Sequence, residues 1–248
     1  MTNEQVILPI PRQVPAIHAW GWTVQGFYLF KENPVMWIIL FLIYLAIVVP
    51  VSLLPVIGSF LSALLAPVFA AGLMWGCQAI SRKEDLEINH LFLGFKKNTS
   101  QLVSVGGIYM LSLLIIAVFV VLSLDKSTID LLVKGQTLSQ AQASKVVLPV
   151  LIAVLFLVPV LMAYWFAPVL VGLHNLTAVQ AMKLSFTASA RNMLPFLLYG
   201  LIFTVLLIVA LIPYGAGLLL VMPMMMTSLY VSYADIFQIN NSIQSPEV

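Results

Sequence analysis

The sequence contains very few charged residues for its length. Only 8% of its 248 residues are Asp, Glu, Lys or Arg, whereas a soluble domain typically has about 25%. Apolar residues make up 62% of the chain, and one core of this size cannot hide so much apolar surface from water. The composition therefore excludes a soluble globular domain and an extended disordered chain, and it indicates an integral membrane protein.

Cysteine and excess positive charge are also scarce. Cys77 is the single cysteine and has no partner, which excludes a disulfide-stapled secreted domain. Eleven Lys and Arg against nine Asp and Glu give a net charge of +2, too small for a nucleic-acid-binding surface. The first 20 residues contain Glu4 and three prolines but no continuous apolar run. They predict a retained cytoplasmic tail, 1–16, rather than a cleaved signal peptide.

Long intervals without charge predict the number of membrane-spanning helices. A hydrocarbon core about 30 Å thick needs about 20 helical residues per crossing. The uncharged intervals 33–81 and 192–234 are long enough for two crossings each, with turns at Pro55–Gly58 and Pro213–Gly215. Two shorter intervals hold one crossing each. The sequence thus predicts one all-α membrane domain over 1–248, a bundle of six transmembrane helices at about 34–53, 59–80, 101–124, 146–172, 194–212 and 217–238.

The positions of Lys and Arg predict the orientation. Six spans place both termini on one side together with eight of the cations, and leave three, Lys126, Lys134 and Lys145, on the other. Cytoplasmic loops carry the excess of Lys and Arg in membrane proteins. We therefore expect a bacterial inner-membrane protein with both termini in the cytoplasm and a periplasmic loop at 125–145.

A similar segment precedes three of the spans. Each contains at least one aromatic residue and ends in a basic residue near an asparagine. The three asparagines are Asn33, Asn98 and Asn192. Their helical spacing predicts three cytoplasmic interfacial helices, with rings at headgroup depth and cations toward anionic lipid. The chain then divides into three two-span pseudo-repeats, although recurring interfacial composition alone gives the same pattern. The candidate contacts for headgroups or a protein partner are Lys31, Lys96, Lys97, Lys183 and Arg191.

Capping patterns predict where three helices begin. Thr177 and Gln180 have capping-box spacing, which favours a helix start at Thr177. Within the 125–145 loop, the segment from Ser127 is expected to cap a short helix that ends at Gly135. The segment 137–140 is expected to cap the helix that continues into span four.

Few residues near the spans carry chemistry. Asp235 is the acid closest to a span, and it either pairs with Lys183 or Arg191 as a structural latch or is solvated at the interface. His18, His90 and His174 all fall on the predicted cytoplasmic side, but no ligand spacing accompanies them. No catalytic residue, cofactor site or metal site is predicted.

Proline is frequent in the fourth span. Pro149, Pro159 and Pro168 lie about ten residues apart and are candidate kinks, because proline lacks a backbone donor. Carbonyls freed in this way can bind a substrate where they face a cavity, although prolines are also common in membrane helices without transport.

Several short motifs along the chain are shared with one group of membrane proteins. They are Gly26, Leu29-Phe30, Pro34, Trp37, Pro55-x-x-Gly58, His90-Leu91-Phe92-x-Gly94-Phe95 and the closing segment Ser232–Phe237. With these motifs the sequence resembles an uncharacterised family of proteobacterial multi-pass inner-membrane proteins. This resemblance implies an inner-membrane location and gives no catalytic residues to transfer. In layout the chain is more distantly similar to the membrane domain of some glycerophosphodiester phosphodiesterases.

These observations favour a non-catalytic protein that organises or assists membrane proteins or lipids through a basic, aromatic cytoplasmic face. The alternative is a small-solute or lipid transporter or channel that uses the proline-containing span four. The expected partners are the lipid bilayer and either another membrane protein or a second copy of the chain, and not nucleic acid.

Overall fold

The computed structural model describes residues 10–55, 57–137 and 139–239. Within these ranges the chain is helical and contains no strand, which confirms the all-α class. Residues 1–9 of the predicted cytoplasmic tail lie outside the described residues.

Six helices in the described part of the chain are long and apolar enough to cross a membrane, as predicted. The fourth of them is interrupted once and therefore has two labels. Their bounds are α2 Pro34–Ser52, α3 Ile57–Ser81, α5 Thr99–Leu122, α7 Gln140–Trp165 with α8 Ala167–His174, α10 Met193–Leu211 and α11 Leu218–Ile236.

Shorter helices precede or connect these six. They are α1 His18–Lys31, α4 Ile88–Leu91, the 3₁₀ turn η1 Leu93–Phe95, α6 Lys126–Val133 and α9 Ala178–Arg191. Two of the three predicted interfacial segments, α1 and α9, are continuous helices. The prediction of one continuous middle helix is wrong, because the chain leaves the helix at Phe92 (φ −99°, ψ 0°). Gly94 then packs on the α3 backbone, where an added Cβ would lie 2.1 Å from the Val68 carbonyl oxygen.

Two of the three predicted helix starts are confirmed. The Thr177–Gln180 capping box lies at the start of α9. Ser139, within the predicted segment 137–140, is the N-cap of α7 and forms a capping box with Gln142. The loop helix α6 is followed by Gly135 at φ +64°.

The N-cap position of α6 is Asp125 rather than Ser127. The Asp125 carboxylate accepts hydrogen bonds from Ser127 Oγ at 2.5 Å and Thr128 Oγ1 at 2.6 Å. These bonds hold the pKa of Asp125 below its ordinary value.

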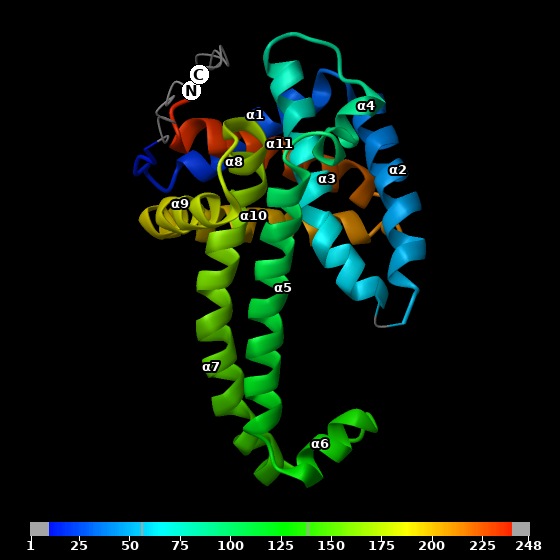
Figure 1. The fold of residues 1–248 in the computed structure, drawn as a ribbon, viewed down its shortest axis with the longest axis vertical. Coiled ribbons are helices and arrows are strands. Elements are labelled where there is room, and N and C mark those ends of the chain that lie inside the picture. The colour runs from blue at the N-terminus through cyan, green and yellow to red at the C-terminus, as the bar shows by residue number, and fades with distance from the viewer. Residues whose placement is uncertain (1–9, 56, 138, 240–248) are drawn as a thin grey trace.

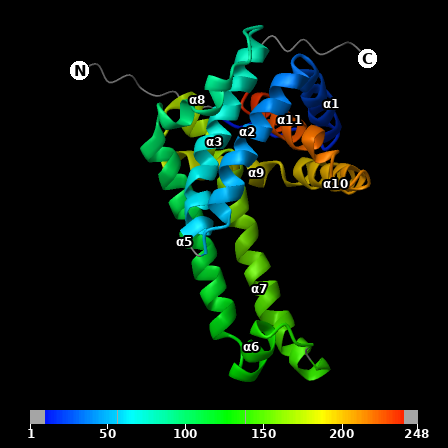
Figure 2. The ribbon, with the colours of Figure 1, turned by 90° about the vertical axis from the view of Figure 1, so that its right-hand side faces the viewer.

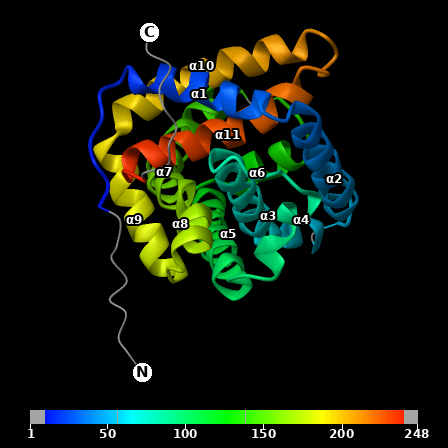
Figure 3. The ribbon, with the colours of Figure 1, turned by 90° about the horizontal axis from the view of Figure 1, so that it is seen from above.

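The six apolar helices are not parallel. α5 and α7 form a long antiparallel pair with α6 at its tip, far from α1, α4 and α8 (Figure 1). α10 lies across the direction of this pair (Figure 2), and from above α1 and α11 run beside it (Figure 3). The hairpins therefore cannot all meet a flat bilayer at one common tilt.

The core is concentrated at one end of the six helices. Buried residues concentrate in the first half of α2, α5 and α10, in the second half of α3 and α11, and in α8; Ala210 near the end of α10 is also buried. The orientation prediction places these parts of the spans toward the cytoplasm. The opposite ends expose large apolar side chains, among them Leu53, Leu122, Leu211 and Ile212. Such exposed apolar surface fits a hydrocarbon environment.

The short helices connect the three hairpins in a cyclic order. α4 and η1 pack on α3, α9 packs on α7 and α8, and α1 packs on α11. Each short helix therefore covers the second span of the preceding unit, and α1 closes the cycle on the last one. This order is the one expected if the chain consists of three two-span pseudo-repeats.

The closing contact between α1 and α11 is very close. A Cβ added at Gly26 would lie 2.5 Å from Ser228 Cα. Thr227 and Ser228 donate their hydroxyl protons to the carbonyl oxygens of Gly26 at 2.8 Å and Trp22 at 3.0 Å. The hydroxyls of Thr227 and Ser228, together with Gly26, thus fix α1 against the last span.

Candidate functional site

The exposed cations predicted to contact headgroups lie beside aromatic rings in two of the three units. Lys31 Nζ is 5.6 Å from the Phe27 ring centre and 5.8 Å from that of Tyr28. Lys97 Nζ is 5.9 Å from the Trp75 ring centre. A cation over a ring face is stabilised electrostatically. We call the exposed set the basic face; it consists of Lys31, Lys96, Lys97, Lys183 and Arg191.

The other members of the basic face have polar neighbours. Lys96 Nζ donates to Asn89 Oδ1 at 3.2 Å. Arg191 Nη1 donates to the Pro11 carbonyl oxygen at 3.2 Å. Lys183 borders a shallow pocket with Met182 and Phe186.

Asp235 connects α11 to the beginning of the described chain. Its Oδ2 accepts from Trp22 Nε1 at 2.7 Å and lies 2.8 Å from His18 Nδ1. Arg12 pairs with Oδ1 and also donates from Nε to the Asp235 carbonyl oxygen at 3.0 Å. The expected partners Lys183 and Arg191 are therefore wrong. Because α1 packs on α11, Arg12 and the residues of α1 occupy the carboxylate instead.

Asn192 fastens the same N-terminal segment to the start of α10. Its Oδ1 accepts from the Val14 amide at 2.9 Å, and its Nδ2 donates to the Arg12 carbonyl oxygen at 2.9 Å. The side chain is fully buried. Sequence spacing does not reveal these contacts, because Asn192 lies 178 residues from Val14 and 180 residues from Arg12.

The three histidines have separate partners. His18 faces Asp235, and His90 Nδ1 accepts from the Glu87 amide at 3.0 Å. His174 Nε2 lies 2.5 Å from the Tyr233 hydroxyl. Each imidazole is thus used in a local contact between or within elements.

The fourth span is interrupted next to Pro168 and is helical through Pro149 and Pro159. Pro168 lies at the beginning of α8, and Phe166 is the residue between the two helices. The Phe166 amide donates to Ser185 Oγ at 2.9 Å, and this hydroxyl donates to the Met162 carbonyl oxygen at 2.7 Å. A hydroxyl from α9 is thus inserted where the amide of residue i normally bonds to the carbonyl of residue i−4.

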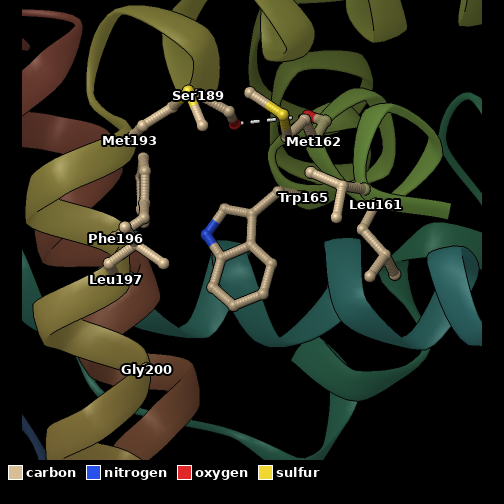
Figure 4. A pocket seen from close by; sticks show the side chains of 9 residues that line it. Leu161, Met162, Trp165, Ser189, Met193, Phe196, Leu197 and Gly200 are labelled. Carbon is tan, nitrogen blue, oxygen red and sulfur yellow. Dashed lines mark hydrogen bonds between the residues drawn. The ribbon is translucent and has the colours of Figure 1, made fainter. Parts of the chain in front are cut away.

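A groove of about 270 Å³ lies between α7, the end of α9 and α10 (Figure 4). The Trp165 indole extends into it, with its nitrogen toward the side of Met193 and Phe196. This Nε1 is buried and has no hydrogen-bond partner among the described residues. The Ser189 hydroxyl, which also lines the groove, donates to the Met162 carbonyl oxygen at 3.3 Å. We call this feature the Trp165 groove; its remaining lining residues are Val158, Leu161, Leu197 and Gly200.

A second cavity of about 370 Å³ lies among the hairpins, and Trp165 also borders it. Tyr44 of α2, Tyr109 of α5 and Tyr164 of α7 line this central cavity, and the last two rings are 4.4 Å apart between centres. Most of its other lining residues are apolar, among them Phe69, Leu73, Met74, Met225 and Leu229. The cavity is therefore mainly apolar with a few phenol hydroxyls.

One curated relative matches most of the chain. The chain is 34% identical over 200 residues to a probable inner membrane protein of Burkholderia thailandensis, and the match covers 77% of this chain and 73% of the relative. The chain belongs to that family of inner-membrane proteins. Membership confirms the resemblance to an inner-membrane family, and the resemblance to the phosphodiesterase membrane domain stays a prediction. No profile of a described family matches the chain, and no solved structure shows significant similarity to it.

Proposed function

We propose that this family member is a non-catalytic component of the inner membrane that binds and organises anionic phospholipids at the cytoplasmic leaflet. The basic face makes the contact, and the orientation is the one predicted from the distribution of Lys and Arg. The phosphate charge is attracted by the cations, while the neighbouring rings lie at headgroup depth.

The observation that supports this proposal best is the pairing of exposed cations with rings at the ends of the spans. Lys31 lies over Phe27 and Tyr28, whose exposed fractions are 42% and 50%. Lys97 repeats the arrangement over Trp75 in the next unit. A cation that is held over a ring at the membrane interface is placed to meet a phosphate without burying its charge.

Retention of lipid by the purified protein tests the proposal. The test variant replaces Lys31, Lys97 and Lys183 with Gln, and the matched control replaces Lys126, Lys134 and Lys145 with Gln. Both lose three charges. From mixed micelles of detergent with phosphatidylglycerol and phosphatidylcholine, we expect the test variant to retain several-fold less phosphatidylglycerol, with retention by the wild type falling as salt rises. Equal retention by the two variants contradicts the proposal.

The central cavity favours a second candidate function, transport of a small solute or lipid. Pro168, at the interruption of span four, lines this cavity. The Ser185 hydroxyl already satisfies the adjacent Phe166 amide and Met162 carbonyl, so this interruption offers fewer free backbone groups than the sequence suggested. Transport predicts flux into reconstituted vesicles that changes on Pro168→Ala, and vesicles that show no flux above protein-free controls exclude it.

A further inference from the structure

The indole N–H of Trp165 is an unused hydrogen-bond donor in an apolar site. It is buried and has no partner among the described residues, and it borders a groove whose other lining is almost entirely apolar. A donor left unpaired in an apolar medium costs free energy because water is not present to replace the partner. Water does not reach Nε1 in this arrangement, so a side chain beside it must move for a ligand to bring an acceptor there; a ligand that does so removes that cost.

The walls of the Trp165 groove are exposed at the surface of the protein. Leu197 is 67% exposed and Met193 is 52% exposed, and both belong to α10, one of the six membrane-capable helices. Gly200 also lines the groove, and a Cβ added there would have nothing within 4 Å. The groove is thus open along α10 and accepts a long apolar body such as an acyl chain.

A cation lies close in the chain to two residues that line the groove. Arg191 is exposed and lies in sequence between Ser189 and Met193, which both line the groove. One of its donors is used by the Pro11 carbonyl oxygen. A guanidinium has five donors, and the others are suited to a phosphate.

We propose that the Trp165 groove binds one phospholipid of the cytoplasmic leaflet. An ester carbonyl accepts from Trp165 Nε1, the acyl chain lies along Leu197 and Gly200, and the phosphate lies toward Arg191. This ligand supplies the acceptor that Trp165 lacks, an apolar body for the groove and a negative charge for Arg191. The inference rests on the proposed lipid-binding function and names one site for it.

Competition between two lipids of equal charge tests the ester contact. Phosphatidylglycerol is compared with its diether analogue, which lacks the ester carbonyls, and bound lipid is measured by native mass spectrometry. We expect the wild type to prefer the diester by about threefold to tenfold, the range that one net hydrogen bond gives. Trp165→Phe keeps an aromatic ring in the groove but loses the indole N–H, and it should abolish the preference for the diester.

Two further variants complete the design. Gly200→Leu should fill the groove and reduce binding of both lipids, since the position has open space and the substitution suits a helix. Trp20→Phe is the control, because Trp20 is 58% exposed on α1 and outside the groove. A diester preference that survives Trp165→Phe, or unchanged binding in Gly200→Leu, overturns the inference.

The two proposals fail separately. Loss of the diester preference in Trp165→Phe with unchanged retention of phosphatidylglycerol in the lysine variant supports the groove and contradicts the basic face. The reverse result contradicts the groove and leaves the basic face supported.

Discussion

At the scale of single residues, Ser185 has a role that the chain's proline pattern does not reveal. Its hydroxyl accepts from the Phe166 amide and donates to the Met162 carbonyl oxygen, so it completes the backbone hydrogen bonding of a helix to which it does not belong. Pro168 explains why the backbone hydrogen bonding of span four is interrupted nearby. The packing of α9 on α7 explains why the Ser185 hydroxyl bridges the interruption.

Ser185→Ala should destabilise the protein by about 1–3 kcal/mol, because it leaves the Phe166 amide without a partner and the Met162 carbonyl with only the longer bond from Ser189. Thr187→Ala is the control on the same helix, since the Thr187 hydroxyl donates only to the Lys183 carbonyl oxygen of its own helix. Thermal unfolding in detergent measures the difference, and hydrogen exchange at the Phe166 amide locates it. Equal melting temperatures for the two variants contradict the role given to Ser185.

Asp235→Asn should loosen the N-terminal segment, because the neutral amide weakens the contacts with Arg12, His18 and Trp22. Hydrogen bonds to charged groups are worth about 1.5–3 kcal/mol each before solvent exposure reduces them. Limited proteolysis at residues 10–17 should therefore become faster. Asp130→Asn, in the exposed loop helix α6, should leave the cleavage rate unchanged; equal acceleration by both variants rejects the latch.

Side-chain partners were the least predictable feature. Asp235 was recognisable as the acid nearest a span, but its partners are 213 to 223 residues away along the chain. Trp165 gave no signal in the sequence, since its importance comes from an unpaired N–H that only the packed structure exposes. Sequence spacing reports such pairs only when both residues lie on one helix.

At the scale of helices, the close contact between α1 and α11 depends on Gly26. Gly26→Ala places a methyl group 2.5 Å from Ser228 Cα, and the α11 backbone must move to accept it. Overpacking of this kind typically costs about 1–3 kcal/mol. We expect a lower melting temperature and easier proteolysis of α1.

Gly21→Ala is the matched control for Gly26→Ala. It lies on the same helix, and an added Cβ there has nothing within 4 Å. Alanine is favoured over glycine within a helix by about 1 kcal/mol, so this variant should be as stable as the wild type or more so. A loss of stability in both variants would show that α1 tolerates no change, rather than that Gly26 is a contact point.

The existence of the apolar helices followed from the sequence, because long uncharged intervals and Pro–Gly turns are local signals. The turn between α10 and α11 contains Gly215 at φ +82°, as its position after Pro213 suggested. The prediction of one continuous helix over the middle interfacial segment is wrong for a reason that is not local in the sequence. Its apolar spacing is helical, but the α3 backbone lies so close to Gly94 that the segment turns as 3₁₀ instead.

At the scale of the whole molecule, labelling of single cysteines tests the orientation. Cys77 is fully buried, so the native chain should react little with a membrane-impermeant maleimide. Lys134→Cys, in the loop predicted to be periplasmic, should label in cells with an intact inner membrane. Glu84→Cys, on the opposite side, should label only after that membrane is opened. Labelling of Glu84→Cys in intact cells reverses the predicted orientation.

The directions of the hairpins could not be predicted from the sequence. Uncharged intervals give lengths, and they carry no information on how one hairpin crosses another. The cyclic packing of α1, α4 with η1, and α9 on preceding spans is a relation between distant segments. The three similar segments indicate three units, but the cyclic packing of these units is set by contacts such as that of Gly26 with Ser228.

The location of the core at one end of the helices has a mechanical consequence. Far from that end, α5 and α7 depend on surrounding acyl chains more than on the other hairpins (Figure 1). A change in bilayer thickness therefore acts on the free ends of the hairpins and leaves the packed end in place. A bundle packed along its entire length must instead tilt as one body to match the same change.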